Sequence, residues 1–98
     1  MNSKTRSYLR SLAQPLSPIV MVGKGGLSES VISTLDNALT DHELVKVRFQ
    51  GFKDEIKSLS EKLSQETNSE LICITGFTSV FFRQEERNPE RKIHLEDK

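Results

Sequence analysis

The hydrophobic pattern at the start of the 98-residue chain predicts a short helix followed by a strand. Apolar positions in segment 3–13 recur at helical spacing: Tyr8, Leu9 and Leu12. Pro15 and Pro18 end this helix, because proline disfavours a helical conformation in the residue before it. The stretch "PIVMVG", residues 18–23, is short, β-branched and bounded by proline and glycine, so it predicts a buried strand.

A second helix and a second strand are predicted after the glycines. Ser28 is the expected N-cap, and Glu29 lies in the first turn, where the helix dipole favours an anion. The apolar stripe that predicts a helix to about residue 41 consists of Val31, Ile32, Leu35, Ala38 and Leu39. Apolar and polar residues alternate in "ELVKVRF", residues 43–49, which predicts a half-buried strand with Lys46 and Arg48 on its open face.

The remaining pattern predicts a third helix and two further strands. The apolar residues of the helix, over about 53–66, are Phe52, Ile56, Leu59 and Leu63, and Asn68 is its stop signal. The nearly continuous apolar run "ELICIT", residues 70–75, predicts a central strand buried on both faces. A short connection at 76–79 leads into "VFFRQ", residues 80–84, which we expect to return as an antiparallel hairpin strand.

The predicted order is therefore α-β-α-β-α-β-β. Strands joined through helices imply right-handed crossovers and parallel pairs, and the last two strands add an antiparallel pair. This order predicts a four-stranded mixed sheet packed with helices, an α/β (α+β) sandwich. We expect one domain over residues 1–84 and a charged, mobile tail over 85–98, in which Ile93 and Leu95 alternate as in a short edge strand.

Charge is distributed unevenly although the net charge is zero. Residues 1–28 contain four basic side chains and no acidic one: Lys4, Arg6, Arg10 and Lys24. The other 70 residues hold ten basic and 14 acidic side chains. Binding responds to the local field, so the basic first third is able to attract a polyanion.

Little in the composition points to catalysis, a metal or a cofactor. The single cysteine, Cys73, and two distant histidines, His42 and His94, do not have the spacing of a metal site. The glycine segment lacks the spacing of a Walker loop and of a dinucleotide fingerprint. We therefore expect no enzyme activity and no cofactor. A lone thiol, no signal peptide and no transmembrane run predict a cytoplasmic protein.

The segment "VMVGKGGLSES", residues 20–30, is the strongest candidate for a binding site. Glycines allow a ligand backbone to approach closely, and a helix N-terminus presents unpaired N–H groups with a favourable dipole. Lys24 adds a full charge at the tip. One interpretation is a tight turn with no further role. Three glycines in four positions and an acid-free flank favour contact with a sugar-phosphate backbone.

The segment from about Lys4 to Arg83 resembles the CRM domain, named for chloroplast RNA splicing and ribosome maturation, in its single-domain bacterial YhbY form. The resemblance comprises "LRSLA", the proline-bounded strand, "GKGGL", "HELVKV" and "TGFTSVFFR", in this order. It implies an RNA-binding domain with a fold similar to the C-terminal domain of bacterial translation initiation factor three. Gly23, Lys24, Gly25 and Gly26 match the family's glycine loop, and Lys4, Arg6 and Arg10 match its basic first helix.

The resemblance has one departure and one rival. Related sequences commonly carry a basic residue after the glycine of the last hairpin, where this chain has Phe77 and Thr78. Phe77 either packs against the domain or stacks on a base. KH domains also use a GxxG loop to clamp nucleotides, but theirs joins two helices, whereas this one follows a predicted strand.

The sequence therefore predicts an RNA-binding protein that acts in ribosome assembly. Its partner would be ribosomal RNA in precursors of the large subunit, bound by a monomer. Lys24 and the loop amides would hold phosphates, Lys4, Arg6 and Arg10 would extend the track, and Lys46 and Arg48 would join if their face is open. One alternative is a protein-interaction module on the ribosome with little RNA contact. A small phosphate-handling enzyme is the other.

Overall fold

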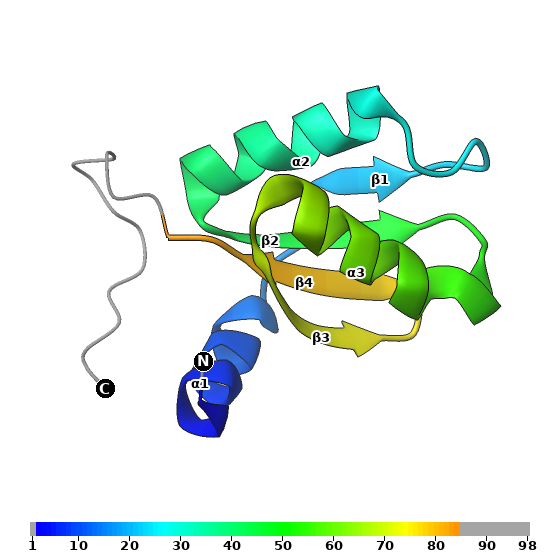
Figure 1. The fold of residues 1–98 in the computed structure, drawn as a ribbon. Coiled ribbons are helices and arrows are strands. Elements are labelled where there is room, and N and C mark those ends of the chain that lie inside the picture. The colour runs from blue at the N-terminus through cyan, green and yellow to red at the C-terminus, as the bar shows by residue number, and fades with distance from the viewer. Residues whose placement is uncertain (1, 85–98) are drawn as a thin grey trace.

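A computed structural model describes residues 2–84, and the predicted tail, with the alternating Ile93 and Leu95, lies outside these residues. The helices are α1 (Ser3–Ala13), α2 (Glu29–His42) and α3 (Ile56–Thr67), the last preceded by a 3₁₀ turn, η1 (Lys53–Glu55). The strands are β1 (Val20–Val22), β2 (Leu44–Phe49), β3 (Glu70–Thr75) and β4 (Thr78–Phe82). The predicted element order and the mixed four-stranded sheet are confirmed (Figure 1).

Short polar residues fix the helix ends, and two of them, Ser28 and Asn68, do so as the sequence predicts. The side chain of Asn2 accepts a hydrogen bond from the Thr5 amide at 2.8 Å and caps α1. Ser28 accepts from the Val31 amide at 3.2 Å and caps α2, as expected. Asn68 ends α3 in the left-handed conformation, with φ of 56°, which asparagine tolerates better than most residues.

Glu43 is the first exception at an element boundary. The alternation places it in the second strand, but it caps the C-terminus of α2 with φ of 67° and is buried. Its amide donates to the Leu39 carbonyl at 2.9 Å, and its carbonyl accepts from the Arg83 amide at 2.9 Å. The residue therefore joins the end of α2 to the end of β4.

The strand order is β1-β2-β4-β3, so the prediction that "ELICIT" is the central strand is wrong. β1 pairs with β2 in parallel, as expected from the helical crossover, and β4 inserts antiparallel between β2 and β3. β3 is an edge strand with exposed ends and one buried residue, Ile72. Its apolar run has another cause: helices cover both of its faces, and a register shift between Leu71 and Cys73 adds an extra apolar residue.

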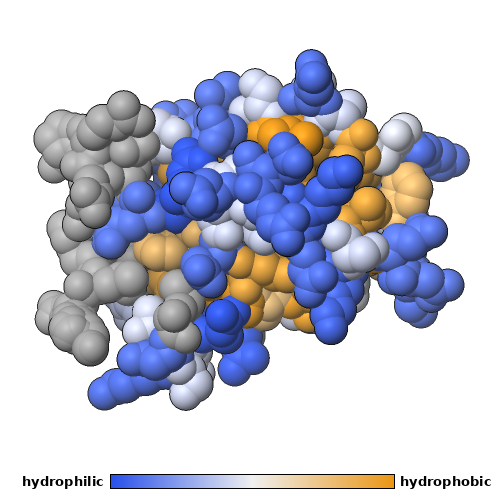
Figure 2. Space-filling view, in the orientation of Figure 1, coloured by the Kyte–Doolittle hydropathy of each residue, from blue (hydrophilic) through white to orange (hydrophobic). Residues whose placement is uncertain are grey.

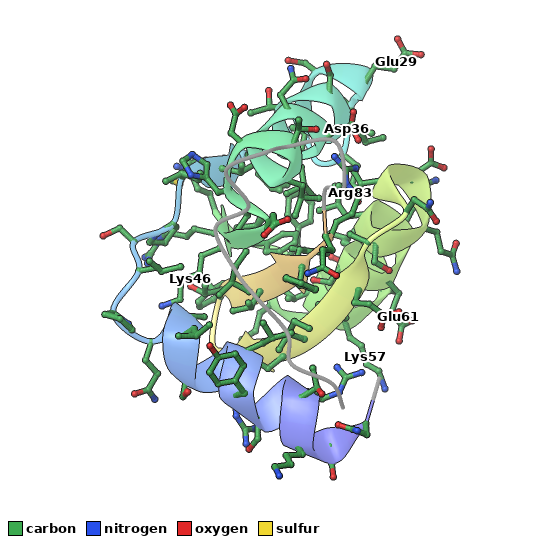
Figure 3. The ribbon with its side chains drawn as sticks, turned by 90° about the vertical axis from the view of Figure 1, so that its left-hand side faces the viewer. Glu29, Asp36, Lys46, Lys57, Glu61 and Arg83 are labelled. Atoms are coloured by element: carbon green, nitrogen blue, oxygen red, sulfur yellow. The ribbon has the colours of Figure 1, made fainter. Side chains whose placement is uncertain are left out.

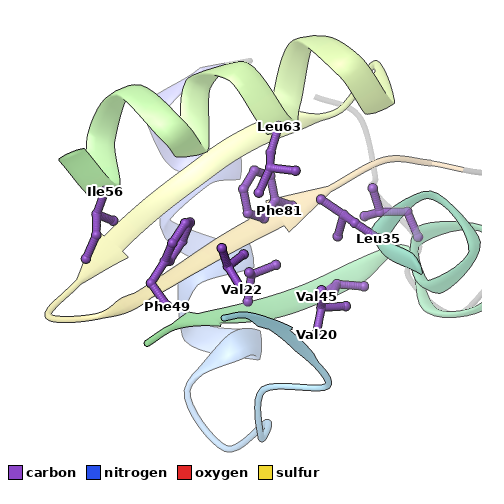
Figure 4. Close-up of a cluster of buried hydrophobic side chains, with 10 residues drawn as sticks. Val20, Val22, Leu35, Val45, Phe49, Ile56, Leu63 and Phe81 are labelled. Atoms are coloured by element: carbon purple, nitrogen blue, oxygen red, sulfur yellow. The ribbon is translucent and has the colours of Figure 1, made fainter. Parts of the chain in front are cut away.

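The core is divided by the sheet into two clusters. The larger lies between the sheet and helices α2 and α3, and Phe49 and Phe81 are its largest fully buried members (Figure 4). The smaller lies between the sheet and α1 and includes Leu9 and Phe82. The prediction that Tyr8 belongs to the apolar face of the first helix is not met, because Tyr8 is 47% exposed.

Arg83 closes the end of β4 against two helices. Its guanidinium donates to the Thr67 carbonyl at 2.8 Å, to the Asp36 carbonyl at 2.9 Å and to the Thr40 hydroxyl at 2.9 Å. It also forms an ion pair with the Asp36 carboxylate at 2.5 Å, and Figure 3 shows the two side chains together. The planar guanidinium has several N–H donors and can therefore bind all these acceptors at once. Arg83 thus holds α2 and α3 against the end of β4.

Candidate nucleic-acid interface

The glycine loop forms a tight turn between β1 and α2. The Gly26 amide donates to the Gly23 carbonyl at 3.0 Å, which places Lys24 and Gly25 at the tip. Gly26 has φ of 79°, a left-handed conformation that favours glycine. A Cβ atom added at Gly26 would lie 3.7 Å from the Phe52 ring. This glycine is therefore required by the turn itself.

Gly25 differs from Gly26, because the turn does not require it. Its φ is not in the left-handed region, and a Cβ atom added there would meet nothing within 4 Å. Within residues 2–84, the amides of Lys24 and Gly25 donate to no other group. Two unpaired N–H groups with an open approach are suited to an anionic backbone, since backbone N–H groups commonly bind phosphate oxygens.

The loop lies at the same end of the sheet as two other connections (Figure 1). The Gln50 amide donates to the Val22 carbonyl at 2.9 Å, and the Phe49 amide donates to the Phe77 carbonyl at 2.8 Å. The start of the loop, the end of β2 and the β3–β4 turn are therefore held side by side. Phe77, in that turn, is 38% exposed.

One row of residues crosses the sheet next to this end, on the face that α1 also covers. Its members are Met21, Arg48, Thr78 and Thr75, placed side by side by the strand register. Arg48 is exposed, so the prediction of an open face is met at this position. Met21 is 46% exposed, which contradicts the prediction that its whole strand is buried. Helix α2 packs on one face of β1 and α1 packs on the other three strands, so only the alternate residues Val20 and Val22 reach the core.

Lys46 is one row further from the loop and has a different environment. Its ammonium group donates to the carbonyls of Gln14 at 3.3 Å and Leu16 at 3.0 Å, so it ties the segment after α1 to β2 (Figure 3). The two carbonyls belong to a segment that contains the predicted helix breakers. Lys46 therefore has a structural role, and it is less available to a ligand than Arg48.

The basic residues of α1 also divide into two kinds. Arg6 donates to the carbonyls of Leu71 at 2.6 Å and Ile72 at 3.0 Å, and its guanidinium lies 3.9 Å from the Glu70 carboxylate. These carbonyls are next to the register shift in β3, so Arg6 satisfies backbone groups there. Lys4 and Arg10 are exposed and have no hydrogen-bond or ion-pair partner among the described residues.

Three of the predicted basic residues lie near the side chain of Cys73. Burial raises the pKa of the Cys73 thiol, while the nearby charges of Arg10, Lys46 and Arg6 act in the opposite direction. Those three cations are therefore near enough to the Cys73 thiol to act on it, on the α1 face of the sheet. With Arg48 in the next row, they form a basic strip that continues toward the glycine loop.

A profile of the CRS1/YhbY (CRM) domain matches residues 1–83. This chain belongs to the CRS1/YhbY (CRM) domain family. It is 36% identical over 96 residues to a protein of Haemophilus influenzae named "RNA-binding protein", covering 97% of this chain and 94% of the relative. A Bacillus subtilis relative, "Probable RNA-binding protein YqeI", is 32% identical over 94 residues, covering 95% and 98% of the two chains.

The fold of this CRM domain matches a solved structure. The solution structure of the Staphylococcus aureus protein SAV1595, described as "a putative RNA binding protein", superposes with a TM-score of 0.80 at 39% identity. The match covers 96% of this chain and 99% of the other. The expected family and fold are therefore confirmed.

The two sides of the sheet in this CRM domain carry opposite charge. Helix α1 has three basic side chains and no acidic one. The segments 29–42 and 53–67, which form α2, η1 and α3, together hold seven acidic and three basic side chains. On the face seen in Figure 2, hydrophilic side chains cover these helices and hydrophobic ones show between them. A polyanion is therefore favoured on the α1 side and disfavoured on the α2–α3 side.

Two features expected from other kinds of protein are not found in the described part of this CRM domain. Residues 2–84 contain no group of three or more His, Cys, Asp or Glu side chains that would hold a metal ion. None of their helices is both long enough and apolar enough to cross a membrane.

Proposed function

We propose that this chain binds RNA through the Gly23–Gly26 loop and the open basic face of the sheet. The observation that carries the proposal is the tip of the loop, where two unpaired amides adjoin Lys24. Arg48 lies close to the same end of the sheet. In this arrangement the amides and Lys24 hold phosphates, Arg48 continues the contact, and Arg10 and Lys4 extend it along α1.

The proposed RNA is ribosomal RNA in precursors of the large subunit, and the proposed role is in ribosome assembly. The resemblance to the bacterial YhbY form supports this choice of RNA, and the names of relatives support RNA binding in general. In this proposal the protein is a cytoplasmic monomer that acts by binding RNA and performs no catalytic step. Arg6 and Lys46 hold the surface in shape and contribute less to binding.

Substitution of Gly25 tests the proposal, because a side chain there has room. Gly25→Asp introduces a negative charge against the phosphates, and Gly25→Asn has nearly the same shape without the charge. We expect both variants to fold like the wild type. Affinity for RNA should fall at least tenfold further for Gly25→Asp than for Gly25→Asn. Equal affinities for wild type and Gly25→Asp would contradict the proposed role of the loop.

A second candidate function, a protein-interaction module, is favoured by a different surface. An open hollow of about 450 Å³ is lined by Leu12, Leu16, Ile19, Leu44 and neighbouring residues, at the other end of the sheet from the loop. Leu16 and Ile19 are 42% and 52% exposed and lie together at this hollow, and exposed apolar side chains that are grouped in this way favour contact with a protein. Crosslinking in cells separates the two candidate functions. Crosslinks of the wild type to RNA in ribosomal precursors, if they are lost in the Gly25→Asp variant, support RNA binding. Unchanged ribosomal association in that variant supports the protein module.

A further inference from the structure

Phe77 lies where a hydrophobic side chain is not expected. It forms the whole β3–β4 connection together with Gly76, which has φ of 59°. Gly76 supplies the left-handed residue of the turn, so the backbone at position 77 accepts most residues, and small polar ones are favoured there because they remain solvated. Phe77 instead leaves an aromatic ring 38% exposed. Neither the conformation of the turn nor the core explains the choice of a phenylalanine at this position.

The position of Phe77 relative to the glycine loop is set by the sheet. Its carbonyl accepts from the Phe49 amide, and Phe49 pairs with Val22, the residue before the loop. Two strand spacings therefore separate the backbones of Phe77 and Val22, or about 10 Å. Consecutive phosphates of one strand lie about 3.4 Å apart along a duplex axis, so a few nucleotides cover this span.

The α1 face of the sheet, next to the end that carries Phe77 and the loop, has groups that are suited to bases as well as to phosphates. Arg48 and Met21 are exposed in the row that crosses the sheet next to this end. A guanidinium plane and an apolar thioether both contact the faces of bases favourably, and only an unpaired strand presents those faces. A duplex presents its phosphates and 2′-hydroxyl groups instead, and would place polar backbone against the Phe77 ring.

From this juxtaposition we propose that Phe77 is a stacking platform that selects unpaired RNA. The inference rests on the proposed function, since it requires the loop to hold the RNA backbone. The loop and Lys24 bind phosphates of either form of RNA. The ring of Phe77 accepts a base a few nucleotides away, which is possible only where the strand is single. The domain is therefore expected to prefer single-stranded segments to duplex.

The test compares a 12-nucleotide RNA with the same strand annealed to its complement. Loss of one stacked base corresponds to roughly a 5- to 150-fold change in affinity. We expect Phe77→Ala and the non-aromatic control Phe77→Leu to lose affinity in this range for the single strand. Their affinity for the duplex should stay within about twofold of the wild type. Single-strand binding by Phe77→Ala at wild-type affinity would overturn the proposal.

A direct optical readout uses the fact that the chain contains no tryptophan. Phe77→Trp introduces a single indole at the proposed platform, and its fluorescence should be quenched on addition of single-stranded RNA but not of duplex. An unchanged emission at saturating RNA would also overturn the platform. The two proposals fail differently. If Gly25→Asp abolishes binding while Phe77→Ala does not, only stacking fails, whereas no RNA binding by the wild type removes the proposed function itself.

Discussion

Replacement of Arg83 should destabilise the domain strongly and leave RNA binding unaltered. The side chain is 19% exposed and contacts two backbone carbonyls, a hydroxyl and a carboxylate. Because Asp36 is 52% exposed, the ion pair itself contributes no more than about 1 kcal/mol. The hydrogen bonds from the charged guanidinium to the three other acceptors each contribute about 1 kcal/mol to the free energy of unfolding. This is a net value, because water can hydrogen-bond to some of these acceptors when the side chain is removed. Arg83→Met should therefore cost about 2–4 kcal/mol.

That loss is a large fraction of the free energy of unfolding of a domain of this size, which is roughly 4–12 kcal/mol. Urea unfolding followed by circular dichroism measures it. Arg83→Lys should recover about half of the loss, because one ammonium group reaches only part of the acceptor set. Lys57→Met is the matched control: an exposed cation on α3, expected to cost less than about 0.5 kcal/mol. A loss below about 1 kcal/mol for Arg83→Met, or a change in RNA affinity of the folded variant, would refute this account of Arg83.

Three further predictions concern buried and strained positions. The hydroxyls of Ser60 and Ser79 are 2.6 Å apart and buried. Ser60→Ala should lower the free energy of unfolding by about 1–3 kcal/mol, because it leaves the buried Ser79 hydroxyl without its partner. Ser79→Ala should cost less, because Ser60 is in a helix and can turn its hydroxyl to the carbonyl four residues earlier. Urea unfolding measures both losses. Gly26→Ala should lower stability by about 1–2 kcal/mol, whereas Gly25→Ala should not. Because burial raises the pKa of Cys73, iodoacetamide at pH 8 should alkylate it more slowly than in the urea-unfolded chain.

The fold was largely predictable because local signals agree with the tertiary structure. Ser28 and Asn68 mark helix ends by their own hydrogen bonding and backbone preferences, which require no distant partner. Strand order does not follow from such signals. The apolar run of β3 is typical of a central strand, and only the packing of α1 on one face and α3 on the other explains it at an edge.

The candidate site was predictable in its loop and less so in its basic residues. Lys46 and Arg48 occupy equivalent alternating positions in the sequence, yet the carbonyls of Gln14 and Leu16 engage only Lys46. Arg6 is engaged in the same way by the backbone of β3. A backbone carbonyl has no sequence signature, so the division between structural and available cations requires the fold. The exposure of Met21 depends on which strands α1 covers, and no local pattern reveals that β1 is left out.

The salt dependence of RNA affinity tests the central claim most directly. On the α1 side of the sheet and in the loop, the available cations are Lys4, Arg10, Lys24 and Arg48. If each releases one counterion, log K for single-stranded RNA should fall with log salt at a slope of about −3. Arg48→Gln should make the slope shallower by about 0.7, whereas Lys46→Gln should leave it unchanged. A wild-type slope near zero, or equal effects of the two substitutions, would contradict the account.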